Sequence, residues 1–262
     1  PDSVNGTNGT ASAIAAGDFN NCAIQAGTGN VACWGILPSP PDSVNGTSGT
    51  ASAIAAGTYH SCAIQAGTGN VVCWGDNTGG QISTPTSVNG ANGTATAIAA
   101  GGSHSCAIQA GTGNAVCWSS ASQSPPASVD GTSGTATAIA AGDDHSCAIQ
   151  DGTGNVVCWG SNSDGQASPP DSVNGTNGTA TAIAAGNFHS CAIQAGTGNA
   201  VCWGSNSSDK ASPPASVDGT NGTATAIAAG LGHNCAIQAG TGNAVCWGYD
   251  GDGQASPPDS VN

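Results

Sequence analysis

Short apolar runs separated by polar turns make up the whole chain, and they return in the same order six times. One complete unit, residues 136–179, reads ATAIAAGDDHSCAIQDGTGNVVCWGSNSDGQASPPDSVNGTNGT. Its apolar runs are AIAA, SCAIQ and VVCW, and Gly, Asn, Ser and Pro fill the segments between them. Runs this short, bounded by turn residues, predict β-strands. No apolar stripe with a 3.6-residue spacing extends far enough to predict a helix.

The repeat period lies between 40 and 44 residues, as the first cysteine of each unit shows. A fixed period of this length indicates a repeat architecture. We expect one repeat domain over residues 1–262, with residues 1–10 completing a terminal unit or joining a neighbouring subunit. The six units cover about 11–50, 51–94, 95–135, 136–179, 180–223 and 224–262.

The two ends of the chain lie at the same phase of the repeat. Residues 1–5 and 258–262 both read PDSVN. We therefore expect the chain to be a mature or excised stretch of a longer repetitive product. Equivalent ends also let one unit continue into the next, so we expect head-to-tail or filamentous self-association.

The two cysteines of each unit fix the register of a predicted β-hairpin. If Cys62 faces Cys73, the connection is either the two residues Gly67–Thr68 or the four residues from Ala66 to Gly69. A two-residue hairpin loop that begins with Gly suits the twist of paired strands. Facing cysteines in antiparallel strands lie within disulfide reach.

We expect a disulfide in each hairpin, because six zinc sites without a fourth protein ligand would be less economical. The zinc alternative would use His60, Cys62 and Cys73, which share one face of the hairpin. The expected pairs are Cys22–Cys33, Cys62–Cys73, Cys106–Cys117, Cys147–Cys158, Cys191–Cys202 and Cys235–Cys246.

The repeated pattern IAAG..HSCAIQ..GNVVCWG.N..GQ resembles the regulator of chromosome condensation repeat, in its cysteine-bearing bacterial and extracellular form. This resemblance implies an all-β propeller with four-stranded blades, usually seven to a ring. Six copies correspond to a six-bladed ring, a ring with a further blade, or part of a longer array. Members of the family have diverse functions, from nucleotide exchange on a small GTPase to inhibition of β-lactamases, so the fold does not determine the function.

Three copies depart from the repeat pattern. The first has Asn20 in place of histidine, and residues 34–41 read WGILPSPP in place of the Asn-x-x-Gly-Gln loop. The third copy lacks that loop after Trp118. The fifth replaces it with a segment that ends at Lys210.

Composition excludes several functions. The chain has a formal charge of -14 and a single basic side chain apart from histidine, so it offers nothing to neutralise the phosphates of nucleic acids or anionic lipids. No run of 18 apolar residues is present, so we expect no membrane span. Twelve cysteines argue against a reducing compartment. We therefore expect an extracellular or cell-surface location.

Near-identical repeats offer no unique acid, base or nucleophile, so we expect neither an enzyme nor a cofactor. The recurring histidines are expected to form structural hydrogen bonds. They are His60, His104, His145, His189 and His233.

The tryptophans, on the face opposite the disulfides, are expected to pack between neighbouring sheets; a sugar-stacking platform is the alternative. They are Trp34, Trp74, Trp118, Trp159, Trp203 and Trp247. Asp250 and Asp252 faintly resemble a calcium loop, but the other EF-hand ligands are missing.

The segments between the hairpins contain candidate glycosylation sites. Asn-x-Ser/Thr acceptor sequences occur at Asn5, Asn8, Asn45, Asn92, Asn174, Asn177, Asn206 and Asn221. The alternative is that Asn-Gly and Gly-Thr simply form turns. Ser-Pro-Pro sequences resemble hydroxyproline-glycosylated stretches of wall glycoproteins; the alternative is a stiff spacer. Their prolines are Pro40, Pro41, Pro125, Pro126, Pro169, Pro170, Pro213, Pro214, Pro257 and Pro258.

Two functions fit these observations. The first is an extracellular structural glycoprotein, a building block of a surface coat or filament. The second is a binding module, of lectin or protein-inhibitor type, that uses variable loops on one face. The positions that vary after each AAG include Phe19, Tyr59, Ser103, Asp144, Phe188 and Gly232.

Overall fold

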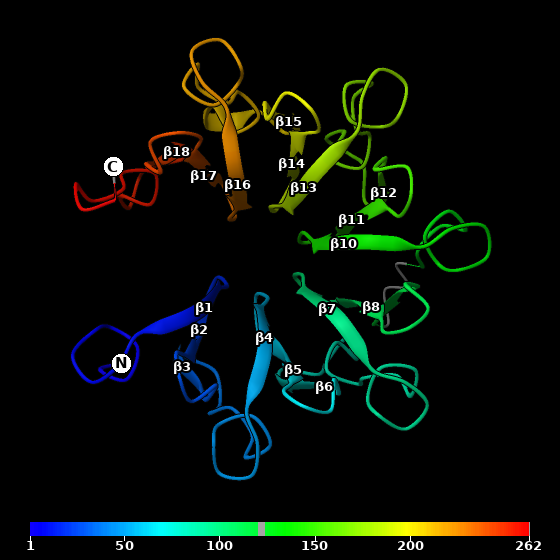
Figure 1. The fold of residues 1–262 in the computed structure, drawn as a ribbon, viewed down its shortest axis with the longest axis vertical. Coiled ribbons are helices and arrows are strands. Elements are labelled where there is room, and N and C mark those ends of the chain that lie inside the picture. The colour runs from blue at the N-terminus through cyan, green and yellow to red at the C-terminus, as the bar shows by residue number, and fades with distance from the viewer. Residues whose placement is uncertain (120–123, 262) are drawn as a thin grey trace. The chain divides into compact units, whose positions relative to one another are not determined.

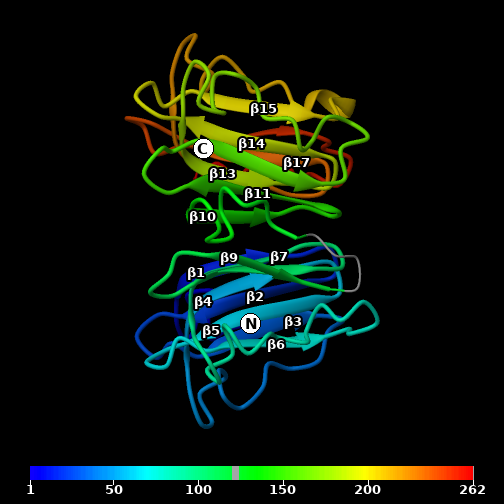
Figure 2. The same ribbon diagram turned by 90° about the vertical axis from the view of Figure 1, so that its right-hand side faces the viewer.

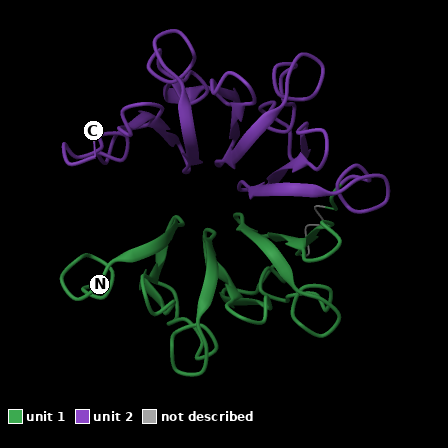
Figure 3. Cartoon of the chain, in the orientation of Figure 1, with its two compact units in different colours: residues 1–125 green, residues 126–262 purple. Residues whose placement is uncertain are grey.

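The computed structural model describes residues 1–119 and 124–261. The chain forms two compact units, Pro1–Pro125 and Pro126–Asn262, which Figure 3 distinguishes by colour. Within the described residues, each unit contains three antiparallel sheets of three strands, and each sheet is formed by consecutive strands (Figure 1). We call these sheets blades 1 to 6 in chain order. No helix among the described residues has the length and apolar character needed to cross a bilayer.

The strands follow the predicted apolar runs. In unit 1 they are β1 (Ala11–Ala16), β2 (Asn20–Gln25), β3 (Val31–Gly35), β4 (Ala51–Ala56), β5 (His60–Gln65), β6 (Val71–Gly75), β7 (Ala95–Ala100), β8 (Ser105–Gln109) and β9 (Ala115–Trp118). In unit 2 they are β10 (Ala136–Ala141), β11 (His145–Gln150), β12 (Val156–Gly160), β13 (Ala180–Ala185), β14 (His189–Gln194), β15 (Ala200–Gly204), β16 (Ala224–Ala229), β17 (His233–Gln238) and β18 (Ala244–Gly248). A short 3-10 helix, Ser207–Asp209, follows β15.

The first strand of each blade contains a β-bulge. In blade 2 the register shifts between Ala51 and Ala53, and the extra residue, Ser52, donates its hydroxyl to the carbonyl of Ile64 at 3.3 Å. The Ser or Thr at this position makes the same bond in every blade. A bulge leaves one residue outside the ladder, and a short hydroxyl side chain compensates for part of that loss.

The hairpin after the second strand has a four-residue loop. In blade 2 the last ladder pair is Ile64 with Val71, and the amide of Gln65 still donates to the carbonyl of Asn70 at 2.8 Å. Gly67 and Gly69 both have positive φ, of 80° and 77°, which explains the glycine spacing. Of the two loops compatible with the sequence, the structure therefore contains the longer one.

The position of the fourth strand is occupied by a turn. In blade 2 the carbonyl of Val88 accepts one bond from the amide of Val71 at 2.9 Å, and the amide of Val88 bonds back to the carbonyl of Pro85. Proline has no amide hydrogen, so a proline-containing segment cannot build a full ladder. The four-stranded blade that the family resemblance implies is thus reduced, in the described residues, to three strands and a turn that covers the edge.

Neighbouring blades within a unit pack face to face. In unit 1, β4 lies against β1 and β2, and β7 lies against β4 and β5. In unit 2, β13 lies against β10 and β11, and β16 against β13 and β14. Figure 2 shows β13, β14 and β15 side by side within one blade. The core therefore lies between blades, in layers built from small apolar side chains.

Candidate functional site

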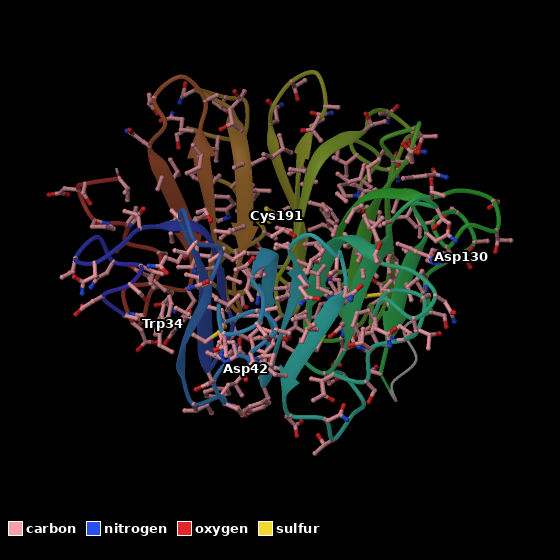
Figure 4. All side chains as sticks on the ribbon, turned by 60° about the horizontal axis from the view of Figure 1, so that its bottom comes forward. Trp34, Asp42, Asp130 and Cys191 are labelled. Atoms are coloured by element: carbon pink, nitrogen blue, oxygen red, sulfur yellow. A yellow bond between two sulfur atoms is a disulfide. The ribbon has the colours of Figure 1, made fainter. Side chains whose placement is uncertain are left out.

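The six expected disulfides are present, one in each blade. Their paired cysteines face each other across the hairpin, with Cα–Cα distances of 4.0 to 4.1 Å. The second-strand cysteines of blades 1 to 5 are fully buried, among them Cys191, which Figure 4 labels. The described residues contain no free cysteine, so the thiolates that the zinc alternative requires are not available. The predicted disulfide-stapled hairpin is confirmed.

Each blade has two chemically different faces. The disulfide face of blade 1 carries Cys22, Ile24 and Val31, and these residues pack against Ala63 and Trp74 of blade 2. The opposite face, which carries the tryptophan, is called the tryptophan face. The same packing recurs between blades 4 and 5 and between blades 5 and 6. We call this arrangement the blade joint. The expectation that the tryptophans pack between sheets is confirmed for Trp74, Trp118, Trp203 and Trp247, whereas Trp34 is exposed.

A buried hydrogen bond from the histidine position crosses each joint. His60 Nε2 lies 2.8 Å from Ser105 Oγ of the next blade, and Ser105 donates its own hydrogen to the carbonyl of Gln81 at 2.9 Å. Because the serine hydrogen is already committed, His60 must carry its proton on Nε2 and donate it. His145 makes the same contact with Ser190 at 2.8 Å. The expected structural role of the histidines is therefore supported by the geometry.

Blades 1 and 6 use asparagine in this network. Asn20, at the histidine position, donates Nδ2 to Ser61 Oγ at 2.6 Å. At the serine position of blade 6, Asn234 Oδ1 accepts from His189 Nε2 at 2.8 Å, and its Nδ2 donates to the carbonyl of Lys210 at 2.8 Å. Asparagine thus replaces either partner, because its amide supplies both a donor and an acceptor.

Burial keeps these histidines neutral. Desolvation lowers the pKa of His60 to about 4, with the charge of His104 adding to the effect and that of Asp76 opposing it. The pKa of His189 is also lowered to about 4 by burial, although its bond to Asn234 acts in the opposite direction. Nδ1 of His60 and His189 has no hydrogen-bond partner. A neutral imidazole with a bare Nδ1 fits a packed joint better than an imidazolium would.

The tryptophan indoles bind the loop of the preceding blade. Trp118 Nε1 donates to the carbonyl of Gln81 at 2.8 Å, and Trp203 Nε1 donates to that of Gln166 at 2.9 Å. In the fifth copy Lys210 takes the glutamine position, and its carbonyl accepts from Trp247 Nε1 at 3.0 Å. That departure from the repeat pattern therefore preserves the joint, because the accepting group belongs to the backbone.

The departure from the repeat pattern in the first copy removes the indole hydrogen bond from the joint between blades 1 and 2. Residues 34–41 replace the loop that would supply a carbonyl, and Nε1 of Trp74 is buried without a hydrogen-bond partner. Oδ1 of Asn20 is buried and unpaired at the same joint. Blade 1 therefore meets blade 2 through a joint that lacks the indole hydrogen bond made at Trp118, Trp203 and Trp247.

The varied residues after AAG lie in the turns between the first and second strands. In unit 1, Phe19 and Tyr59 stack with their ring centroids 4.9 Å apart, and both are about half exposed. Thr58 Oγ1 donates to Asp18 Oδ2 at 2.9 Å beside them. Ser103 occupies the matching turn of blade 3. We call the surface formed by the three turns of a unit its turn edge.

Unit 2 has its own turn edge, with Asp144, Phe188 and Gly232 in equivalent turns. The carbonyls of these three residues accept backbone bonds from Ser161, Ser205 and Tyr249 at 2.8 Å. The residue that follows Trp-Gly therefore lies beside each varied position, a neighbour that sequence reasoning did not identify. The recognition role of both turn edges stays a prediction.

The acceptor asparagines fall into two structural groups. The first Asn of each VNGT sequence closes a turn: Asn45 Oδ1 accepts from the amide of Thr47 at 2.9 Å, and Nδ2 donates to the carbonyl of Pro40 at 3.1 Å. Asp130 and Asp218 accept the same amide bond. Asn5 and Asn174 behave like Asn45 in accepting this bond.

The second group is exposed. It comprises Asn8, Asn92, Asn177 and Asn221. Asn206 belongs to neither group, because its side chain binds Ser212 and the amide of Ala211 in the loop after β15. The Ser-Pro-Pro prolines all belong to the described residues, and they lie in or next to the turns that cover the blade edges. Glycosylation at all of these positions stays a prediction.

The acidic residues singled out in the sequence make structural contacts. Asp250 Oδ2 accepts from Ser256 at 2.6 Å and its Oδ1 accepts from the amide of Ala255 at 2.7 Å, and these bonds lower its pKa. Within the described residues no three His, Cys, Asp or Glu side chains gather as a metal site. Asp42 and Asp130, labelled in Figure 4, lie in the segments between blades.

Solved structures with the same fold include proteins from plants and yeast. The chain is 25% identical to the CRINKLY WD40 ectodomain of the Arabidopsis thaliana receptor kinase ACR4, with a TM-score of 0.70. The aligned region covers 91% of this chain and 79% of the ACR4 chain. It is 25% identical to the entire ectodomain of the Physcomitrella patens receptor kinase CR4, with a TM-score of 0.71. Here the aligned region covers 92% of this chain and 62% of the CR4 chain. For Prp20p of Saccharomyces cerevisiae the identity is 19%, the TM-score 0.66, and the coverage 90% and 71%.

Among curated proteins, none matches this chain. The family model described as "Regulator of chromosome condensation (RCC1) repeat" matches residues 51–81, 136–166 and 180–209. All six copies carry the two cysteines and the tryptophan, and the three unmatched copies share the strand register of the matched ones. The predicted fold class is confirmed, and six disulfides indicate an oxidising environment. Three of the six copies match the RCC1 repeat model, and the chain has the fold of an RCC1-like β-propeller.

Proposed function

We propose that this chain is an extracellular structural protein without catalytic activity, a building block of a surface coat or filament. The observation that carries the proposal is the repetition of one joint chemistry in blade after blade. In each blade pair within a unit, the histidine position of one blade binds the residue before the first cysteine of the next. Such uniformity suits assembly and load bearing, whereas catalysis needs one blade to differ from the others.

The disulfides support the extracellular part of the proposal. A core of Ala, Ile and Val buries little area per residue, so covalent staples compensate for it. Disulfides persist in secreted proteins and at cell surfaces. The similarity to two receptor-kinase ectodomains points in the same direction. Glycans on the exposed asparagines would add to such a coat.

Surface labelling tests this function. Antibodies raised against the chain should label intact, unpermeabilised cells of the source organism, and chain extracted from those cells should contain disulfides and no free thiols. Label found only after permeabilisation, together with free cysteines, would contradict the proposal.

A binding module is the second candidate, and the turn edge of unit 1 favours it. Phe19 and Tyr59 expose a stacked aromatic pair next to the polar groups of Asp18 and Thr58. Aromatic rings flanked by hydrogen-bonding groups are typical of recognition surfaces for sugars and for proteins. A glycan array and a surface-protein pull-down with the native chain and with Tyr59→Ser test it. Equal signals from both chains would contradict a role for this edge.

A further inference from the structure

Two Asn-Gly steps follow each other in the loop that precedes the first strand of a blade. In unit 1 the loop reads PTSVNGANGT, with the steps at Asn89 and Asn92. In unit 2 it reads PDSVNGTNGT, with the steps at Asn174 and Asn177. Glycine leaves its own nitrogen unshielded, because it has no Cβ, so this nitrogen attacks the preceding asparagine side chain most readily. Both asparagines of the second loop precede Gly-Thr, so a difference in their reactivity has to come from the structure.

The first step of the loop is locked by three hydrogen bonds. Asn174 Oδ1 accepts from the amide of Thr176 at 2.9 Å, and Nδ2 donates to the carbonyl of Pro169 at 3.2 Å. The amide of Gly175 contains the nitrogen that would attack, and it donates to the carbonyl of Gly178 at 2.7 Å. The side chain is therefore held in the turn, and the nitrogen keeps its proton.

Unit 1 contains the same lock. Asn89 Oδ1 accepts from the amide of Ala91 at 3.0 Å, and its Nδ2 donates to the carbonyl of Thr84 at 3.3 Å. The amide of Gly90 donates to the carbonyl of Gly93 at 2.8 Å. These bonds have to break before the glycine nitrogen can reach the side-chain carbon of the asparagine, and each broken bond raises the barrier.

The second step of the loop has its reacting groups free. The side chain of Asn177 is exposed, and neither it nor the amide of Gly178 makes a hydrogen bond within the part of the chain that the structure describes. The same holds for the side chain of Asn92 and the amide of Gly93. The turn around them is nevertheless fixed, because the amide of Asn177 donates to the carbonyl of Asp171 at 2.8 Å. The attacking nitrogen and the leaving amide are thus both unoccupied at an otherwise ordered place.

We propose that Asn92, Asn177 and Asn221 are sites of self-modification, at which the chain converts asparagine into a mixture of aspartate and isoaspartate through a cyclic imide. Asn221 is included because it is exposed, precedes Gly-Thr and makes no side-chain hydrogen bond among the described residues. The locked Asn89 and Asn174 are protected. The nucleophile is the chain's own backbone and the co-reactant is water, so no enzyme is required.

The reaction balances without oxidation or reduction. The nitrogen of Gly178 gives its proton to water and bonds to Cγ of Asn177, while the bond from Cγ to Nδ2 breaks and Nδ2 takes up a proton and leaves as ammonia. The glycine nitrogen of the cyclic imide is then bonded to both Cγ and the main-chain carbonyl carbon of residue 177. Water that breaks the bond to Cγ produces aspartate, and water that breaks the main-chain bond produces isoaspartate. One water is consumed and one ammonia is released.

The two positions of the loop differ in sequence as well. Aspartate occupies the first position in two loops, as Asp130 and Asp218, and accepts the turn-closing amide bond there. The second position is Asn or Ser in every copy; the serines, Ser48 and Ser133, cannot form the imide. Each conversion adds a negative charge to an exposed turn. A modified loop therefore presents a carboxylate at a position where no copy of the repeat encodes one.

Peptide mapping of the whole chain by mass spectrometry tests the proposal. The chain is produced in the periplasm of a bacterium that lacks asparagine glycosylation, so that disulfides form, and is then incubated in oxygen-18 water at mildly alkaline pH. Each imide that opens takes up one heavy oxygen, and fragmentation assigns it to one asparagine. Conversion at Asn92, Asn177 and Asn221 should be at least about tenfold faster than at Asn89 and Asn174, because only the last two have to break hydrogen bonds.

The unfolded chain supplies the matched control. In urea and after reduction of the disulfides, Asn174 and Asn177 should convert at the same rate, because the same Gly-Thr follows each of them. Asn177→Ser, the residue type that two other loops carry, should abolish conversion there and leave the rates at Asn92 and Asn221 unchanged.

Three results would overturn the proposal. The first is a folded chain in which Asn174 converts as fast as Asn177. The second is a folded chain that stays unmodified at Asn177 under conditions that convert it in the unfolded chain. The third is a difference between Asn174 and Asn177 that persists after unfolding, because the hydrogen bonds of the turn would then not be its cause.

Discussion

Mild acid should destabilise both units through their buried histidines. His60 in unit 1 and His189 in unit 2 have pKa values lowered to about 4, and the ordinary value is 6.5. The unfolded chain therefore binds protons at these positions at a higher pH than the folded chain does. As the pH falls from 6.5 to about 4, the free energy of unfolding should fall, and below about 4 the histidine contribution should level off.

The size of the effect follows from the pKa difference. The fall from 6.5 to about 4 corresponds to about 3 kcal/mol for each histidine at 1.36 kcal/mol per pH unit. A loss of this size is a large fraction of the stability of an ordinary domain. The carboxylates whose pKa values are lowered from 3.8, such as Asp76, titrate below this window, so they do not contribute to it.

Urea unfolding followed by tryptophan fluorescence, repeated between pH 6.5 and 4, measures this loss. The control is His60→Asn, since Asn20 already shows that asparagine can donate to the serine of the next blade. That variant should lose about 3 kcal/mol less than the native chain across the same range. A native unfolding free energy that does not change between pH 6.5 and 4, or a variant that loses as much as the native chain, would refute the reasoning.

Three further predictions concern single contacts. Replacing Cys62 and Cys73 together by Ala should lower the free energy of unfolding by about 3 kcal/mol, measured by urea titration; no loss would contradict a stapling role. Trp203→Phe should lower the free energy of unfolding by about 1 to 2 kcal/mol more than Trp74→Phe does, because of the two indoles only that of Trp203 donates a hydrogen bond. Equal losses in thermal unfolding would count against the carbonyl of Gln166 as the partner of Trp203. Asp218→Asn should be nearly neutral, since asparagine accepts the same amide bond in other repeats, whereas Asp218→Ala should cost about 1 kcal/mol; equal losses would exclude the turn-closing role.

Local pattern was enough to predict the strands and their register. The eleven-residue separation between Cys62 and Cys73 fixes which residues face each other, and the alternation along the strand then puts Trp74 on the opposite face. The same spacing left two loop lengths open, because sequence does not reveal whether Ala66 pairs with Gly69; in the structure the amide of Gly69 bonds to the carbonyl of Gln65 instead.

The contacts between blades could not be derived in the same way. Ser105 lies 45 residues beyond His60, in the next repeat, and no local pattern connects them. A signal was nevertheless present, because a Ser or Asn directly precedes the first cysteine of every copy. The reduction of the fourth strand to a turn was also signalled, by the prolines that precede Val88 and its counterparts. The unpaired indole N–H of Trp74 follows from the substituted segment at residues 34–41 of the preceding repeat, an effect that is visible only in three dimensions.

Peptide mapping of the untreated chain by mass spectrometry, after alkylation of any free thiols, is the most direct test of the account. Stapled blades predict six linked peptide pairs, each joining the two cysteines of one hairpin, and no alkylated cysteine. Alkylated cysteines throughout, or links that join cysteines of different repeats, would contradict it.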